Sequence, residues 1–570
     1  MRRWLLIALP LAALVIAGWF YFAKTSTAAS DVTALLPTKT IFFAHLPDLN
    51  HTRDQWRQSD IYKLFSEPTV REFIRSSAPN AIYPQHDEAN EDIQRLDPKD
   101  IFIALIPTGD GKSSLAAGFR FKGRQSAADQ IVTKWRNRLA PAWARGTPAT
   151  STYRQHSLQT FASPGLAVTT VWVGQWFFAS TNAAAVHALI DRLDQPPQDR
   201  QSAFASDEVY RAALAHMPRN YALLVYLQPR ALAERFAALR TAFDQRFAPD
   251  KQEFLNQIGA VCATTRFDGG KIHDVVFAAV PRHGAQKLTR SSQSLGSADT
   301  ALYFASLLNE RSLGPMSQAA ALAPLGGWLQ KFGALTNRSG VIAEDWQAAF
   351  DLELGTVIDW PENARWPALV ATLPVKDHAR AVEIATRVAT AANDDATWTK
   401  TEKNGVIYLT TASTASLFAI SPTIALSERL LVAGLDAGSV DVAIARSQSG
   451  GTGLAASPTY RSAARNLPEP TASFGYVDTA LLYSRLDASL RPLLVMSAAF
   501  VPTLSRYFDP AKLPPATAVT KHLSPIVSSQ RHVADGYVAE SIGPVTTNDA
   551  AVTLALAAIY WAMFGHRSQQ

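Results

Sequence analysis

The chain is almost without cysteine, since Cys262 is the only one among its 570 residues. A single cysteine cannot close an intramolecular disulfide, so the fold has no disulfide framework and depends on its hydrophobic core. Cys262 lies in the apolar stretch 258–263, which is typical of a strand. We therefore expect it to be a small buried hydrophobic residue, because no neighbouring signature supplies the base that a nucleophilic thiol needs.

An excess of charge of one sign is also missing. The 54 lysines and arginines are opposed by 48 aspartates and glutamates, which leaves a net charge of +6, and no run of five or more like charges occurs. A nucleic-acid-binding surface usually shows a clustered basic face, so we expect no nucleic-acid partner. The composition, 47% hydrophobic and 18% charged, is that of a globular chain too long for one core.

The short motifs of common catalytic and metal sites are absent from the sequence. There is no His-Glu-x-x-His, no Gly-x-Ser-x-Gly, no clustered Cys/His spacing and no Asp-rich calcium loop. Gly111-Lys112-Ser113 resembles the end of a phosphate-binding loop, but Ile106 stands where the first glycine is required. We read this segment as a hairpin turn and predict no cofactor, no metal and no catalytic residue.

The N-terminus, in contrast, carries a long apolar run. It begins at Trp4, ends at Phe22 and contains no charged residue, which is close to the roughly 20 residues that a membrane-spanning helix needs. Arg2 and Arg3 precede it and favour a cytoplasmic N-terminus. We expect residues 1–29 to form a signal anchor, with a cleaved signal peptide as the alternative. Both alternatives place the bulk of the chain in the periplasm or outside the cell, and the signal anchor predicts a single-pass protein of the inner membrane.

A second apolar segment lies at the C-terminus. The alanine-rich run 550–565 is short for a span, so we expect residues 549–570 to form a buried or surface helix. A second membrane span is the alternative, and Arg567 would suit a cytoplasmic end.

The chain between these segments repeats itself. Matching residues recur in the same order at offsets of 250 to 261 positions, as loop insertions between two copies would produce. The clearest block is a short helix, a proline and an apolar strand. In the first copy it contains Phe204, Tyr210, Arg211, Pro218 and Tyr226, and in the second Leu454, Tyr460, Arg461, Pro468 and Tyr476.

Each copy mixes helices with antiparallel hairpins. In the first copy we expect a hairpin of residues 101–106 and 115–121, helices over 127–139 and 183–193, and a closing turn at Asp268-Gly269-Gly270. This pattern predicts an α+β fold of two tandem homologous repeats, preceded by an N-terminal transmembrane helix. The predicted domains are 1–29 (signal anchor or signal peptide), 30–283 (first repeat), 296–548 (second repeat) and 549–570 (C-terminal helix).

Six residues are candidates for binding. Tyr-Arg pairs recur in both copies and either form ligand-facing sites or preserve packing. Two tryptophans of a Pro-bounded loop either bind a glycan, a peptide or a membrane face, or pack in the core. The candidates are Tyr210, Arg211, Tyr460, Arg461, Trp360 and Trp366. His45, in a strand that ends before Asp48, is expected to face outward or to be hydrogen-bonded, although a His near an Asp also suits acid–base chemistry.

Three segments resemble a known family. Residues 36–48, the Tyr-Arg pairs with their following prolines, and residues 360–370 are similar to bacterial membrane-anchored envelope proteins classified as a domain of unknown function. The resemblance covers most of the chain after residue 29. It implies a membrane-anchored envelope protein and no particular activity, cofactor or catalytic residue.

These observations favour a non-catalytic envelope protein that binds a partner protein, a lipid or another hydrophobic ligand, held at the membrane by the run from Trp4 to Phe22. An envelope hydrolase whose catalytic groups meet only in the fold is the second hypothesis, which a pocket with converging carboxylates or histidines would support. A structural subunit of an envelope assembly is the third, which exposed sheet edges or a broad apolar patch would favour.

Overall fold

The chain divides into two compact units in a computed structural model. The first unit comprises Met1–Tyr62 and Ile82–Pro281, and the second comprises Lys63–Ala81 and Arg282–Gln570. Within them the structure describes residues 26–27, 30–77, 87–108, 113–140, 147–163, 166–195, 203–235, 257–280, 287–308, 338–392, 398–411, 421–500 and 512–548.

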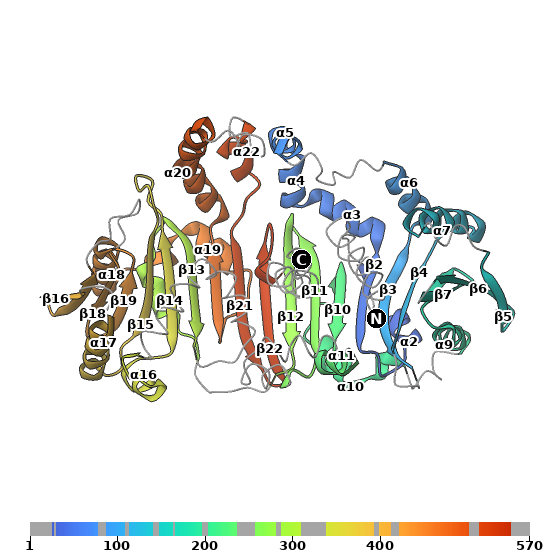
Figure 1. The fold of residues 1–570 in the computed structure, drawn as a ribbon, viewed down its shortest axis with the longest axis horizontal. Helices are drawn as coiled ribbons and strands as arrows, with labels where there is room; N and C mark the ends of the chain where they lie inside the picture. Colours follow the sequence, from blue (N-terminus) through green and yellow to red (C-terminus); the bar gives the residue numbers. More distant parts are fainter. Residues whose placement is uncertain are drawn as a thin grey trace, which may run out of the picture. The chain divides into compact units, whose positions relative to one another are not determined.

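The first unit is built on an antiparallel sheet (Figure 1). Its described residues supply ten strands in the spatial order β12-β11-β10-β2-β3-β4-β8-β7-β6-β5. Alternating burial along β7, where Thr169, Val171 and Val173 are buried, is the mark of a strand with unlike faces. The strands are β2 (Phe42–Asp48), β3 (Lys99–Pro107), β4 (Ser113–Arg120), β5 (Ala149–Tyr153), β6 (His156–Ser163), β7 (Leu166–Val173), β8 (Trp176–Ser180), β10 (Leu223–Leu227), β11 (Val261–Asp268) and β12 (Lys271–Ala278).

The turn between β11 and β12 shows why glycine is needed there. Gly269 and Gly270 have φ of 55° and 86°, in the left-handed region that suits a two-residue hairpin turn. The helices of this unit are α2 (Ser30–Leu35), α3 (Leu49–Gln58), α6 (Asp87–Leu96), α7 (Gln125–Leu139), α9 (Ala183–Asp194), α10 (Glu208–Leu214) and α11 (Pro229–Arg235). A short pair of β1 (Ser26–Thr27) and β9 (Asn220–Tyr221) and the 3-10 helix η2 (Phe204–Ser206) complete it.

The second unit has an antiparallel sheet of the same plan. Its described strands follow the order β22-β21-β20-β13-β14-β15-β19-β18-β17-β16, which repeats the order of the first unit strand for strand. The strands are β13 (Thr300–Leu307), β14 (Glu353–Asp359), β15 (Ala368–Pro374), β16 (Trp398–Lys403), β17 (Val406–Thr411), β18 (Thr423–Leu426), β19 (Leu430–Gly434), β20 (Ser473–Val477), β21 (Ile526–Val533) and β22 (Gly536–Gly543).

Helices cover both faces of this second sheet. One face packs against α18 and short 3-10 turns, around a core that includes Tyr303, Val432 and Val440. The other face packs against α16 and α17, around a core that includes Phe350 and Ile384. The helices are α16 (Ala343–Ala349), α17 (His378–Ala392), α18 (Ala437–Ser449), α19 (Pro458–Ala464), α20 (Thr479–Phe500) and α22 (Ala516–Thr520), with 3-10 turns η3 (Ser291–Leu295) and η5 (Gly453–Ala456).

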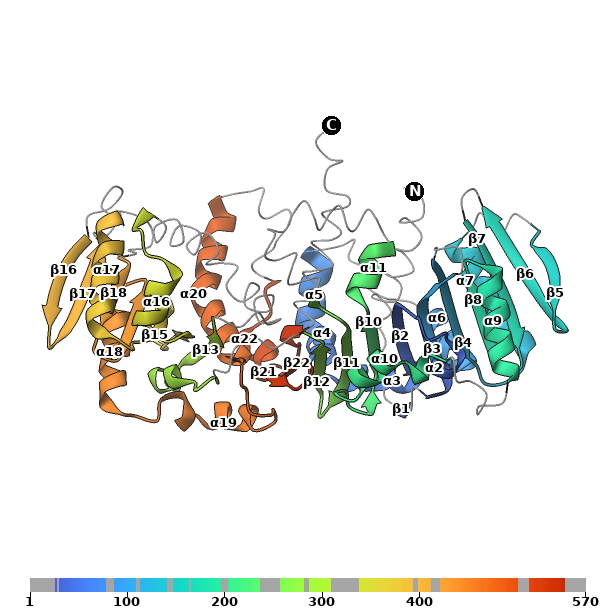
Figure 2. The same cartoon turned by 90° about the horizontal axis from the view of Figure 1, so that it is seen from below.

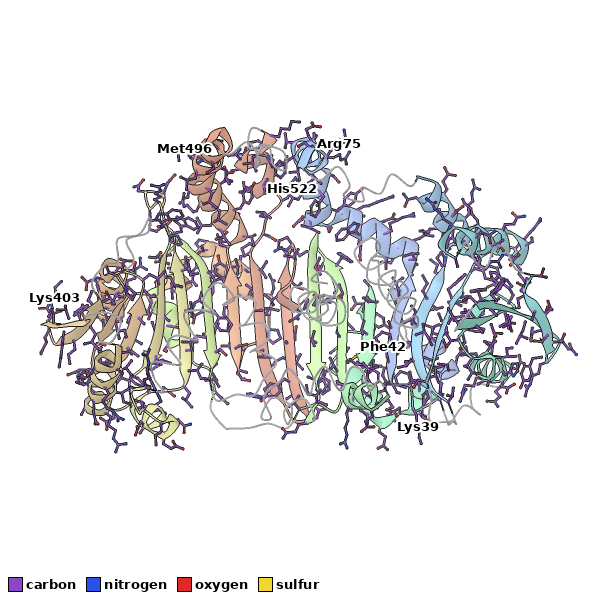
Figure 3. All side chains as sticks on the ribbon, viewed as in Figure 1. Lys39, Phe42, Arg75, Lys403, Met496 and His522 are labelled. Carbon is purple, nitrogen blue, oxygen red and sulfur yellow. The ribbon has the colours of Figure 1, made fainter. Side chains whose placement is uncertain are left out.

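Residues 63–81 belong to the second unit although they stand early in the chain. They contain most of α4 (Asp60–Ser66) and all of α5 (Pro68–Ser77). Glu67, between these helices, lies 2.7 Å from both Nζ of Lys521 and Nε2 of His522. His522, which is labelled in Figure 3, follows α22. Both partners lower the pKa of the Glu67 carboxyl below its ordinary value, chiefly through hydrogen bonds to its charged form.

Corresponding helices of the two units begin at corresponding capping residues. Asn182 accepts a hydrogen bond at the start of α9, as Asp436 does at the start of α18. In the same way Asp207 caps α10 and Ser457 caps α19. These local signals explain why both copies form helices at equivalent places.

The predicted fold needs one correction, which concerns the N-terminal transmembrane helix. No helix in the described ranges combines the length and the apolar character that crossing a bilayer requires. Helix α20 has 22 residues, but its sequence includes the charged residues Arg485, Asp487 and Arg491. Charged side chains are costly in the hydrocarbon core of a membrane. The run from Trp4 to Phe22 and the C-terminal segment 549–570 lie outside the described residues. The α+β character is confirmed, whereas the membrane part of the predicted fold is wrong.

A candidate apolar binding site

A cavity lies between the sheet of the second unit and helices α16 and α17. Figure 2 shows the ribbons of both helices beside strands β15 and β18. Its floor follows from the alternation of strand β15. Val370 points to the face that packs against α18, whereas Leu369, Ala371 and Leu373 line the cavity. The period of two therefore places most lining residues of β15 on one face, although Thr372, which alternates with them, also borders the cavity.

Small residues create the room. Ala371 of β15 pairs directly with Ala433 of β19, so two methyl groups lie side by side on the cavity floor. Ala385 of α17 also lines the cavity, so another small side chain is contributed by the helix that covers the sheet. Protein interiors are normally filled to the density of organic crystals, and here alanines stand where larger side chains would close the gap.

The cavity has a volume of about 260 Å³ and an apolar lining. None of its lining residues carries a formal charge, and Thr356 and Thr372 supply its only hydroxyls. The Thr372 hydroxyl is directed to the carbonyl of Gly355, at 3.5 Å. Leu308, at the rim, is half exposed, which leaves one part of the cavity accessible. An apolar space of this kind accepts apolar molecules.

Helix α17 is held in place at two points. His378 Nδ1, at its first residue, lies 3.2 Å from the carbonyl oxygen of Ser427 in the β18–β19 turn. Further along, the Arg387 guanidinium donates to the carbonyl oxygens of Ser339 (3.3 Å) and Gly340 (2.8 Å), just before α16. These bonds keep both helices over the sheet without filling the space beneath them.

An empty cavity of this size is expensive. At about 24 cal/mol per Å³ of cavity, a volume of 260 Å³ corresponds to an upper bound of about 6 kcal/mol if it were closed and empty. The whole stability of a domain is only about 5–15 kcal/mol. A bound apolar molecule would recover part of this free energy.

The Tyr-Arg pairs are not part of the cavity. Tyr210 is 1% exposed and packs against Phe204 and Tyr226 in the core of the first unit. In the second unit Tyr460 is buried against Phe474 and Tyr476. The tyrosines therefore occupy equivalent packing positions.

The arginines that follow these tyrosines have a different environment. Both Arg211 and Arg461 are exposed, whereas the tyrosines beside them are buried. Burial raises the pKa of the Tyr210 hydroxyl well above its ordinary value, so this hydroxyl stays neutral.

The two candidate tryptophans have different environments. Trp360 is 3% exposed, and its Nε1 donates to the carbonyl oxygen of Ala364 at 3.1 Å. Trp366 is 36% exposed and lies under the Arg365 guanidinium, 5.6 Å from the ring centroid. Neither ring lines the cavity.

His45 lies in a buried polar cluster of the first unit. Its Nδ1 is 2.9 Å from the Tyr221 hydroxyl, and its Nε2 is 3.6 Å from the Asp100 carboxylate, which Arg120 also contacts at 2.6 Å. Burial lowers the pKa of His45, although Asp100 acts in the opposite direction. The His45 side chain is completely buried, so no substrate reaches it, and we read the cluster as structural.

Reactive thiols and metals do not add another site. Burial raises the pKa of Cys262 to about 12, and its side chain is fully buried, as expected from the sequence. Within the described part of the chain, no group of three or more His, Cys, Asp or Glu residues is arranged to hold a metal ion.

The lining residues of the cavity were not predicted from the sequence. The signal was present in the repeated alanines: Ala117 pairs with Ala179 in the first unit as Ala371 pairs with Ala433 in the second.

Comparisons with known proteins give no family. No family model and no curated protein matches the chain. Among solved structures, crystal forms III, I and IV of a protein designated TP0453 share 7%, 8% and 6% sequence identity with it. Each alignment covers 45% of this chain and 81%, 82% and 88% of the other, with TM-scores of 0.23, 0.22 and 0.21. Likeness at this level carries no conclusion about fold or function.

Proposed function

We propose that this protein binds an apolar small molecule in the cavity beneath α16 and α17. The observation that carries the proposal is a space of about 260 Å³ without a charged residue in its lining. Ligand sites are typically concave and mostly apolar, with few polar groups. The apolar lining supports an occupant, because covering it with an apolar molecule removes apolar surface from water.

The volume sets the size of the ligand. A cavity of about 150 Å³ accepts benzene, so about 260 Å³ has room for roughly ten carbon atoms by the same proportion. The absence of charged lining residues disfavours an ion in the interior, because a buried charge without a partner is strongly penalised. The ligand that fits is therefore a medium-length hydrocarbon chain, with any polar group kept at the accessible rim near Leu308.

A fluorescent titration tests the proposal. The full-length protein is titrated with 1-naphthylamine, an uncharged probe of ten carbon atoms whose emission moves to shorter wavelength in apolar surroundings. We expect a saturable shift that 1-decanol reverses. Decane-1,10-diol should compete much less well, because one of its hydroxyls would be buried without a partner, at a cost of about 1–3 kcal/mol.

A matched pair of variants localises the probe. Ala385→Phe adds a ring inside the cavity, whereas Val442→Phe adds the same ring at an exposed position of α18. We expect the first variant to lose probe binding and the second to keep it. Equal binding by both variants, or no saturable signal from the unaltered protein, would exclude the cavity as the binding site.

That the bulk of the protein lies outside the cytoplasm is a prediction from its sequence. We propose that the ligand is met in the cell envelope, where lipids and their products supply hydrocarbon chains. Fractionation of cells that express the full-length chain is the test, and recovery of the protein with the cytoplasmic fraction alone would contradict it.

A further inference from the structure

We infer that the chain carries one apolar site rather than two, because aromatic side chains occupy the equivalent place in its first copy. The inference rests on the proposed binding function and goes beyond it: it fixes the stoichiometry and names the residues that decide which copy binds.

Strand pairing defines which positions are equivalent. Phe119 of β4 pairs with Phe177 of β8, as Leu373 of β15 pairs with Leu431 of β19. Both leucines line the cavity of the second unit. On the next strand, Trp172 pairs with Phe177 as Leu426 pairs with Leu431. Three aromatic residues of the first copy thus stand where the second copy has leucine.

The covering helices show the same difference. Helices α7 and α17 each have 15 residues and follow equivalent strands. At the eleventh residue of the helix, α7 carries Trp135 and α17 carries Val388, which lines the cavity. At the eighth residue, α7 carries Val132 and α17 carries Ala385.

The aromatic residues of the first copy pack on one another. The ring centroids of Trp172 and Phe177 are 4.7 Å apart, those of Phe119 and Phe177 are 5.3 Å apart, and those of Phe121 and Trp172 are 5.2 Å apart. These separations are those of rings in direct contact. Trp135 packs on the same cluster.

Hydrogen bonds fix the two tryptophans of this cluster. Trp172 Nε1 donates to the carboxylate of Asp129 at 3.0 Å, and Trp135 Nε1 donates to that of Asp92 at 3.2 Å. Lys134 also contacts Asp92, at 2.6 Å, so this acceptor keeps a charged partner. The rings are therefore held in place and do not depend on packing alone.

The segment before β14 differs in the opposite direction. Helix α16 precedes β14 as α6 precedes β3, and the second copy has Trp346 in this helix and Phe350 directly after it. These two rings pack on each other, with centroids 5.1 Å apart, and form a wall of the cavity. They add bulk, but a volume of about 260 Å³ remains above the leucines and alanines.

Grafting the side chains of the first copy into the second tests the inference. The double variant Val388→Trp and Leu431→Phe places two of these aromatic side chains in the cavity, and Leu431→Phe alone is the milder version. Phe177→Leu is the control in the first copy. Full-length protein is used throughout, with binding of 1-naphthylamine counted by native mass spectrometry and titrated by fluorescence, and folding followed by circular dichroism.

The expected results are specific. The unaltered protein and Phe177→Leu bind one probe, the double variant binds none, and Leu431→Phe binds at least tenfold more weakly, while all retain cooperative unfolding. If the double variant does not fold, the single variant decides by its affinity.

Two results would overturn the inference and leave the protein a binder: two probes bound per chain, or binding that survives the grafts but is lost in Phe177→Leu. No binding by the unaltered protein would instead reject the proposed function itself.

Discussion

Filling the cavity should make the second unit more stable, which is the opposite of the usual effect of enlarging a core residue. Ala385→Phe is the change, at a lining position that is 9% exposed. Burying a phenyl ring is worth about 1.5–3 kcal/mol. Ordering the new side chain and small adjustments of Val388 and Ile384 offset part of this, so we expect the free energy of unfolding to rise by about 1–2 kcal/mol.

Differential scanning calorimetry of the full-length protein without ligand is the assay. For a unit of this size, 1 kcal/mol shifts the melting temperature by roughly 2–4 °C, so an upward shift of roughly 2–8 °C is expected. Val442→Phe, which is 49% exposed on α18, should change it little. In a fully packed site the same substitution costs about 1–3 kcal/mol, so a fall in melting temperature for Ala385→Phe would refute the reasoning.

Further predictions concern groups outside the cavity. Glu353 is 2% exposed and accepts hydrogen bonds from Thr289, Arg290 and Ser291, in the segment that leads into η3. Glu353→Gln should therefore lower the free energy of unfolding by about 1.5–3 kcal/mol, measured by urea denaturation. An unchanged denaturation midpoint would contradict this prediction. The pKa of Glu67 is lowered in the folded protein, so its interactions stabilise above the ordinary carboxyl pKa of 4.5 and are lost as the pH falls below it. Protection factors of the α5 amides, which correct hydrogen-exchange rates for their intrinsic pH dependence, should therefore fall as the pH is lowered through this range. Unchanged protection factors would count against the Glu67 contacts. Cys262 should not react with iodoacetamide at pH 8 until urea unfolds the chain, and rapid labelling of the native protein would show that its thiol is accessible.

Local structure followed closely from local sequence. The hairpin expected over 101–106 and 115–121 corresponds to β3 and β4, and the helix expected over 127–139 corresponds to α7. The turn at Gly269 and Gly270 has the positive φ values that these glycines indicated. Alternation, capping residues and turn glycines act over a few residues, so they can be read from the chain alone.

The candidate sites show where local signals end. The recurrence of Tyr210 and Tyr460 at equivalent places indicated that both have the same role. Only the packing showed that this role is to lie buried among other aromatic rings. His45 lies beside Tyr221, 176 residues later, and this separation is invisible to a motif search. The membrane helix expected at the N-terminus was inferred from hydropathy, and it has no counterpart among the described helices.

By itself, then, the sequence determined the α+β character of the chain, the approximate extents of several helices and strands, and the recurrence of residues between its two copies. Tertiary structure alone decided that Leu431 and Val388 border an open space while Phe177 and Trp135 belong to a cluster of packed rings. The physical reason is that a cavity is the volume left over after side chains from many separate elements have packed. The residues that line it come from β14, β15, β18, β19, α16 and α17. No single one of these segments shows that their side chains together do not fill the space between the sheet and the helices.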